Sequence, residues 1–65
     1  MHINVNGEDK DITSTTVADL FQELEINPRG MLVHINGILV HWTKYDSFQI
    51  HDYDDIGIIR VVAGG

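Results

Sequence analysis

The chain contains no cysteine and only four basic residues among its 65. Without cysteine it can form no disulfide bond, no thiolate nucleophile and no cysteine-based metal site. Such a composition suits the reducing cytoplasm, where we expect the protein to be located. Ten acidic residues give a formal net charge of −6. Because nucleic-acid binding depends on Lys and Arg that neutralise phosphates, we expect no nucleic-acid partner.

The sequence also lacks a long apolar run and a signal-peptide pattern. A helix that spans a bilayer needs about 20 consecutive apolar residues, and no segment approaches that length. The negative charge disfavours an anionic membrane surface as well, so we expect no membrane partner. Residues 1–65 are expected to form a single domain. Its core is small and leaves little room for a catalytic cleft, so we expect no enzyme active site.

The first half of the chain predicts a hairpin followed by a short helix. Residues 2–6 alternate polar and apolar side chains, as in a half-buried strand, and Asn6-Gly7 is a dipeptide favoured in tight hairpin turns. Thr16 is expected to cap a helix over residues 17–25, which Asn27-Pro28 ends. The buried stripe of this helix has the spacing i, i+3, i+4, i+7 and consists of Val17, Leu20, Phe21 and Leu24.

The second half predicts another hairpin, an irregular segment and a last strand. Asn36-Gly37 joins residues 31–35 to residues 38–42, and a two-residue loop pairs Ile35 with Ile38. One face of this hairpin is expected to pack on the helix, namely Met31, Val33, Ile35, Ile38, Val40 and Trp42. A single helical turn and a solvated acidic turn precede the last strand at residues 56–62. The order predicts an α+β fold, in which one helix covers a mixed sheet of four to five strands.

The chain closes with two glycines, Gly64 and Gly65, after an apolar strand. Glycine lacks a Cβ atom, so these residues can pass through a narrow channel and adopt backbone angles barred to other residues. We expect residues 62–65 to form a flexible functional tail that delivers a carboxylate into another protein's active site. There the carboxylate can be adenylated and converted to a thioester or a thiocarboxylate. The alternative is a frayed terminus without a function.

A second candidate site lies on the outward face of the predicted sheet. If Ile56 and Ile58 face the core, the residues between and after them face outward, together with alternate residues of the second hairpin. A contiguous apolar patch beside a functional tail often marks a docking site. We therefore predict a partner-docking face formed by Leu32, His34, Leu39, Ile59 and Val61.

The order of elements and several short motifs resemble the ubiquitin-like β-grasp sulfur carriers, most closely the thiamine-biosynthesis (ThiS-like) type. The matching stretches cover nearly the whole chain and are Ile3-Asn4-Val5-Asn6-Gly7, Thr15-Thr16-Val17-Ala18-Asp19-Leu20, Ile26-Asn27-Pro28-Arg29-Gly30, Val33-His34-Ile35-Asn36-Gly37, Asp52-Tyr53-Asp54 and Val62-Ala63-Gly64-Gly65.

The resemblance implies that a ubiquitin-activating-type enzyme adenylates Gly65 with ATP. Sulfur then replaces the adenylate, and the resulting thiocarboxylate donates its sulfur to a thiazole synthase-like enzyme. Gly64 and Ala63 belong to the tail, while the partner enzymes supply every catalytic group. The carrier therefore needs no cofactor of its own.

Other readings of the sequence remain open. The sulfur acceptor could instead serve molybdopterin or tungsten cofactor, cysteine or homocysteine synthesis, or tRNA thiolation. A ubiquitin-like modifier would use the same Gly65 in an isopeptide bond. His34 and His41 lie diagonally on one predicted face, but no further ligand joins them, so we expect no metal site.

The family commonly has glycine where this chain has Tyr53, and tyrosine is strained at positive φ, so we expect a different turn there. The bulky His41-Trp42 pair is a further departure that bears on partner choice.

Overall fold

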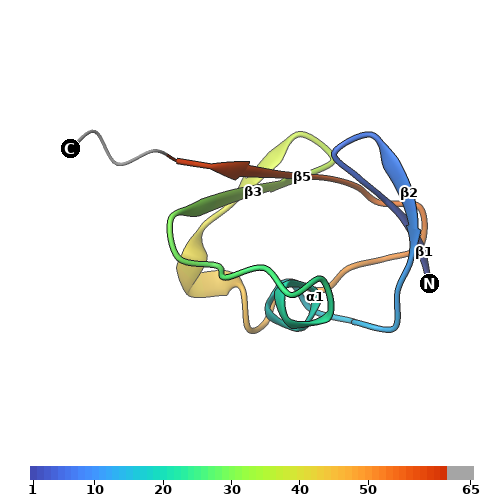
Figure 1. Ribbon diagram of the computed structural model, residues 1–65, viewed down its shortest axis with the longest axis horizontal. Coiled ribbons are helices and arrows are strands. Elements are labelled where there is room, and N and C mark those ends of the chain that lie inside the picture. Colours follow the sequence, from blue (N-terminus) through green and yellow to red (C-terminus); the bar gives the residue numbers. More distant parts are fainter. Residues whose placement is uncertain (62–65) are drawn as a thin grey trace.

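A computed structural model describes residues 1–61 as a five-stranded mixed sheet with one helix against its inner face (Figure 1). The strand order is β2-β1-β5-β3-β4, with β1 parallel to β5 and the other pairs antiparallel. The predicted α+β architecture is confirmed. The elements in chain order are β1 (His2–Val5), β2 (Glu8–Asp11), α1 (Val17–Glu23), β3 (Met31–Ile35), β4 (Ile38–Val40), the 3₁₀ turn η1 (Trp42–Lys44) and β5 (Asp55–Arg60).

Both predicted Asn-Gly turns are present with two-residue loops. Asn6 and Gly7 have φ of 53° and 84°, and Asn36 has φ of 52° before its own glycine; such positive angles are what a tight hairpin turn requires. The side chain of Asn6 also joins the sheet. Its Oδ1 accepts from the Ile58 N–H at 2.8 Å and its Nδ2 donates to the Ile58 carbonyl at 3.1 Å. This residue therefore extends the contact between β1 and β5.

Helix α1 begins as predicted and ends two residues earlier than predicted. The Thr16 hydroxyl accepts from the Asp19 N–H at 3.2 Å and so caps the helix. At the other end Glu25 adopts φ of 57°, and the Ile26 N–H donates to the Phe21 carbonyl at 2.9 Å. This is a Schellman arrangement, here with glutamate in place of the usual glycine. The helix therefore stops before Asn27-Pro28 is reached.

The hydrophobic core lies between α1 and the inner face of the sheet. Val17, Leu20 and Phe21 are buried as predicted, while Leu24 is half-buried. Tyr45 completes the core beside Phe21, with ring centroids 5.4 Å apart. Its hydroxyl donates to the Met31 carbonyl at 3.2 Å, and burial raises the pKa of Tyr45 above its ordinary value of 10.0. The remaining buried apolar residues are Ile3, Val5, Ile12, Val33, Ile35, Val40, Ile50 and Ile56.

Two residues predicted for the core are exposed. Ile38 pairs with Ile35 as expected, but it lies on the edge strand β4 and is 64% exposed. Trp42 is 71% exposed, because the strand ends at Val40 and the chain turns into η1. His41 caps this turn with its Nδ1, which accepts from the Thr43 N–H at 3.3 Å. The strand predicted over residues 38–42 therefore ends two residues early.

The acidic turn before β5 is part of the fold and is not merely solvated. Asp54 is buried, and its carboxylate accepts from the His51 N–H at 2.8 Å and from the Asn36 side chain at 3.0 Å. Asp52 accepts from the His2 N–H at 2.7 Å. Between them Tyr53 adopts φ of 67°. The expectation that tyrosine would change this turn is wrong, since Tyr53 takes the left-handed conformation with its side chain in solvent.

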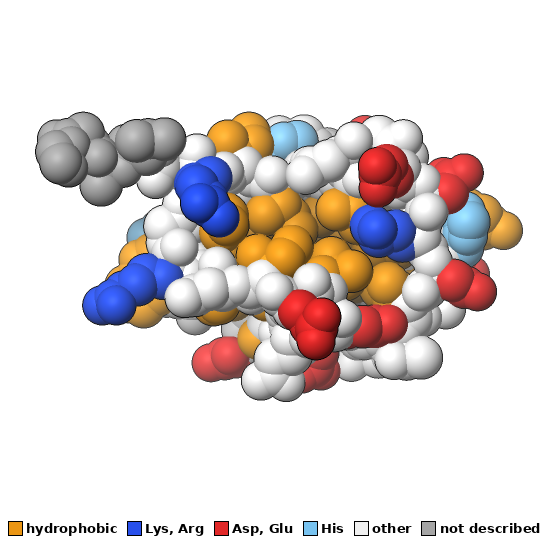
Figure 2. Space-filling model, in the orientation of Figure 1, with side chains coloured by type: hydrophobic (Ala, Val, Ile, Leu, Met, Phe, Trp, Pro, Cys, Tyr) orange, Lys and Arg blue, Asp and Glu red, His pale blue; other side chains and the backbone are white. Residues whose placement is uncertain are grey.

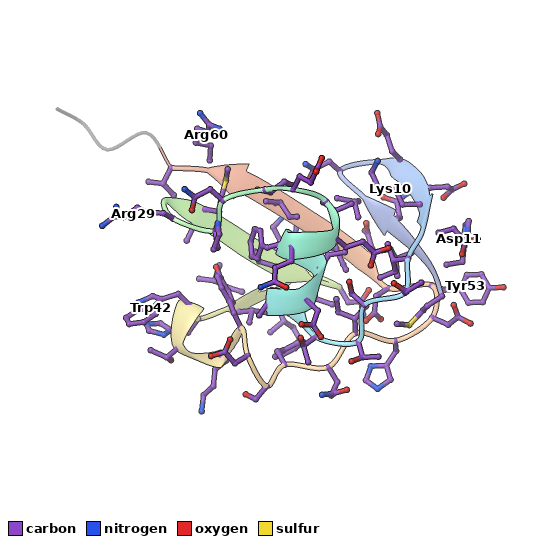
Figure 3. The ribbon with its side chains drawn as sticks, turned by 60° about the horizontal axis from the view of Figure 1, so that its bottom comes forward. Lys10, Asp11, Arg29, Trp42, Tyr53 and Arg60 are labelled. Carbon is purple, nitrogen blue, oxygen red and sulfur yellow. The ribbon has the colours of Figure 1, made fainter. Side chains whose placement is uncertain are left out.

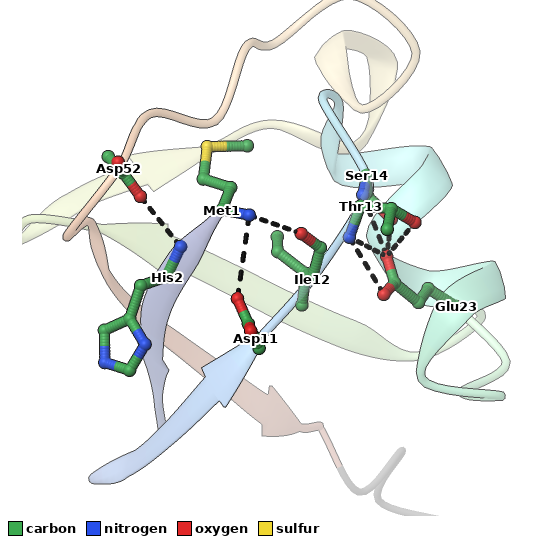
Figure 4. A network of polar contacts seen from close by, with 8 residues as sticks. All are labelled: Met1, His2, Asp11, Ile12, Thr13, Ser14, Glu23 and Asp52. Atoms are coloured by element: carbon green, nitrogen blue, oxygen red, sulfur yellow. Dashed lines mark hydrogen bonds and ion pairs between the residues drawn. The ribbon is translucent and has the colours of Figure 1, made fainter.

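A carboxylate clamp fixes the helix to the segment that precedes it (Figure 4). Both Glu23 carboxylate oxygens accept from the Thr13 N–H at 3.0 Å, and one also accepts from the Ser14 N–H at 2.9 Å and from the Ser14 hydroxyl. These bonds lower the pKa of Glu23 below its ordinary value of 4.5, and the bond from the Ser14 hydroxyl has the largest effect. The end of α1 is thereby held against the segment that leaves β2.

Candidate partner-docking face

The register of β5, β3 and β4 brings the predicted docking residues together on the outer face of the sheet. Leu32 lies opposite Ile59, and His34 lies between Gly57 on one side and Leu39 on the other. Directly opposite residues on one face are close enough for their side chains to touch. Val61 follows Ile59 by two residues, one position beyond the end of β5, so alternation predicts the same side for it. We call the set Leu32, His34, Leu39, Ile59 and Val61 the outer patch.

The four aliphatic residues of the outer patch are exposed. Leu39 is 64%, Ile59 52%, Val61 46% and Leu32 42% accessible to solvent. Together they form an apolar surface without a charged member, on the side of the sheet opposite α1. Such a surface is suited to burial against another protein rather than to chemistry of its own.

His34 is half-buried because its ring lies over the backbone of Gly57. A Cβ atom on Gly57 would be 2.0 Å from His34 Nε2 and 2.1 Å from Cε1, far inside van der Waals contact. Glycine at this position is therefore required for space. The imidazole therefore lies on the outer face of β3, between Leu39 of β4 and Gly57 of β5, at the centre of the outer patch.

The inner side of the same strand end carries a feature that the sequence reading missed. Arg60 lies opposite Met31 in the register, so by alternation it points to the helix side of the sheet. Arg60, Arg29 and Val61 line one open hollow, and Arg29 and Val61 also border a second, more apolar hollow beside Trp42. Arg60 is the one charged residue within 56–62, and that is the signal from which it could have been singled out.

The tail residues of the prediction, Ala63, Gly64 and Gly65, lie outside the described residues. The described chain reaches Val61, whose N–H donates to the Gly30 carbonyl at 2.8 Å. This bond fixes the point from which residues 62–65 continue. The predicted tail therefore starts at the edge of the outer patch.

Neither a cluster of metal ligands nor a membrane-crossing helix occurs within residues 1–61. No three His, Cys, Asp or Glu side chains of this part of the chain lie close enough to hold an ion. His34 and His41 serve other contacts, over Gly57 and as the cap of η1. The described helices are too short or too polar to cross a bilayer.

The model of the ThiS family matches residues 3–65, almost the whole chain. The chain belongs to the ThiS family. ThiS proteins are small carriers that act with partner enzymes of thiamine biosynthesis, so membership supports a sulfur-carrier role and fits a protein without catalytic groups. No curated protein matches the chain in sequence.

Solved structures show the ThiS fold in the same arrangement. The crystal structure of the thiamine biosynthesis protein ThiS from Geobacter metallireducens is similar with a TM-score of 0.86 and 22% identity, over 100% of both chains. A solution NMR structure of a thiamine biosynthesis protein from that organism gives a TM-score of 0.76 and 22% identity, over 100% of this chain and 88% of the other. The ubiquitin-like β-grasp fold predicted from the sequence is thus confirmed.

Proposed function

We propose that the protein carries sulfur as a thiocarboxylate on Gly65 and donates it to thiamine thiazole synthesis. The observation that carries this proposal is the ThiS family match over residues 3–65, which includes the Gly-Gly stretch. In support, the fold leaves an apolar outer patch beside Val61, where the chain enters that stretch.

The chemistry requires activation, because a carboxylate is a poor electrophile. A carboxylate oxygen of Gly65 attacks the α-phosphate of ATP, and pyrophosphate leaves. The mixed anhydride then has AMP as a good leaving group, which a sulfur nucleophile of the partner system displaces. Every catalytic group belongs to the ubiquitin-activating-type enzyme and to the thiazole synthase-like acceptor. ATP is abundant in the cytoplasm, where we propose that the carrier works.

We further propose that the outer patch docks the activating enzyme. Leu32 and Ile59 face each other across β3 and β5, and Val61 continues the patch to the start of the tail. A partner that covers this apolar surface brings its active site within reach of Gly65. Small residues at positions 63–65 are then needed for passage into the site.

Intact-mass analysis of the protein purified from its native host tests the proposal. The expected result is a fraction whose mass is increased by the replacement of one oxygen by one sulfur at Gly65.

Deletion of Gly65 should abolish both this fraction and ATP–pyrophosphate exchange with the activating enzyme, and Gly64→Val should weaken both. Thermal stability should be almost unchanged, since chain ends make few contacts. A tail-deleted protein that still acquires sulfur contradicts the proposal, and conjugates to target lysines identify a modifier instead.

A further inference from the structure

The two sides of β5 differ at the point where the tail begins. Ile59 points outward into the outer patch, whereas Arg60 points to the helix side, and Val61 follows directly beyond the end of β5. Arg29 directly precedes Gly30, whose carbonyl accepts from the Val61 N–H at 2.8 Å. The described chain therefore ends at Val61, between an apolar side and a basic side of the sheet. We call Arg29 and Arg60 the tail-root arginines.

The tail-root arginines lie at one end of the molecule, where Glu25 and Asp46 are the acidic residues that line hollows with them. Figure 3 shows both near one end of the molecule, with Lys10 and Asp11 at the opposite end. In Figure 2, Lys and Arg side chains stand at the left and also right of centre, while most Asp and Glu side chains lie to the right and below. In a chain of net charge −6, two arginines at one end make that end less acidic than the rest of the molecule.

Within residues 1–61, neither arginine forms an ion pair. The ion pairs within residues 1–61 all lie in the first hairpin: the Met1 amino group with Asp11, His2 with Asp9, and Lys10 with Glu8. Glu25 also lines the hollow that the tail-root arginines share, but it forms no ion pair with either in the described part of the chain. Both arginines are exposed. No carboxylate of residues 1–61 is ion-paired with their guanidinium groups, which can therefore bind an external carboxylate.

We propose that Arg29 and Arg60 bind carboxylates at the mouth of the channel through which the activating enzyme receives the tail. This inference rests on the proposed function, and it adds the chemistry of the partner's second contact surface. A channel that encloses the tail meets the outer patch on one side and the tail-root arginines on the other. An acidic group on that second side forms charge-assisted, bidentate bonds with a guanidinium group.

The charge asymmetry also orients the approach. An acidic channel mouth attracts the basic end and repels the acidic remainder of the carrier, so the tail arrives first. Electrostatic guidance of this kind acts mainly on the association rate and weakens as salt screens the charges. The outer patch, being apolar, contributes mainly to the lifetime of the complex.

Charge reversal at the two ends of the molecule tests the proposal. Arg60→Glu and Lys10→Glu change the net charge equally, but only Arg60 is a tail-root arginine. Association with the purified adenylating enzyme of the same host, with MgATP present, is followed by stopped flow at low and high salt. We expect Arg60→Glu to slow association about tenfold at low salt and to converge with the parent at high salt. Lys10→Glu should remain close to the parent, and Arg60→Gln should lie between the two.

Several outcomes overturn the proposal. Equal slowing by Arg60→Glu and Lys10→Glu would mean that only net charge matters, and no slowing would mean that the arginine makes no contact. Absence of association by the parent protein would also refute it. Melting curves of each variant ensure that slow association does not reflect unfolding. The proposed function is judged separately, by the intact mass of the protein from its host, because a carrier without sulfur can still bind through its arginines.

Discussion

The two faces of β3 and β5 carry similar residues with opposite exposure. Val33 of β3 and Ile56 of β5 lie on the inner face under α1 and are 0% and 1% exposed. Leu32 of β3 and Ile59 of β5 lie on the outer face and are 42% and 52% exposed. Alternation along the strand explains this geometry, but it does not explain why the outer residues are apolar. The inner face is needed for folding, and we infer that the outer face is needed for a partner.

The largest effect is expected on the inner face. Phe21 is buried and packs beside Tyr45, so Phe21→Ala should lower the free energy of unfolding by about 3–5 kcal/mol. Leu39→Ala is the matched change on the outer face, where the side chain is exposed, and should cost no more than about 0.5 kcal/mol. Chemical denaturation of both variants measures the difference. Equal losses would mean that the two faces do not differ in their contribution to folding.

A smaller loss is expected where the outer face is itself packed. Gly57→Ala places a methyl group into the His34 ring, and overpacking of this kind costs about 1–3 kcal/mol. Adding His34→Ala should restore most of the lost stability, because it removes the colliding ring. A double-mutant cycle of unfolding free energies measures this coupling. If Gly57→Ala alone is neutral, the ring of His34 does not rest on the glycine.

The parts of the fold that local sequence determines were predictable. Both turns follow from the Asn-Gly dipeptides, the register of the second hairpin follows from its two-residue loop, and the Thr16 cap follows from local hydrogen bonding. The exposure of Ile38 could not be predicted in this way, because it depends on which strand lies at the sheet edge. Tyr53 is a different case. The fold holds it at positive φ through the Tyr53 N–H, which donates to the His2 carbonyl at 2.6 Å.

The candidate site was predictable on one side of β5 only. Alternation along the second hairpin and along β5 puts the residues of the outer patch on one face, whereas the β3–β5 register that sets Leu32 opposite Ile59 is known only from the fold. The tail-root arginines are 31 positions apart in the sequence (60 − 29), and no local pattern links them. They become neighbours because the Gly30 carbonyl binds the Val61 N–H. Such a tertiary contact is visible only in the folded chain.

The carboxylate clamp that holds α1 against Thr13 and Ser14 predicts a pH dependence. The pKa of Glu23 is lower in the folded chain than its ordinary value of 4.5. The folded state therefore gains stability from this carboxylate above that value and loses the gain as the pH falls through the lowered pKa. Glu23→Gln should reduce the thermal stability at neutral pH and should flatten its decline in acid. Melting temperatures across this pH range measure both effects. An unchanged acid profile would show that the clamp does not contribute.

The smallest effect on stability, with the sharpest effect on function, is expected from a matched pair of isoleucines. Ile59 belongs to the outer patch, whereas Ile38 lies on the opposite side of the sheet at its edge, and both are exposed. Aspartate at either position should change the unfolding free energy by no more than about 0.5 kcal/mol. Ile59→Asp should weaken equilibrium binding to the activating enzyme about tenfold or more, because it places a charge in an apolar contact. Ile38→Asp should bind like the parent. Equal weakening by both would mean that the enzyme also contacts the edge of the sheet. If Ile59→Asp binds as strongly as the parent, the outer patch is not the docking surface.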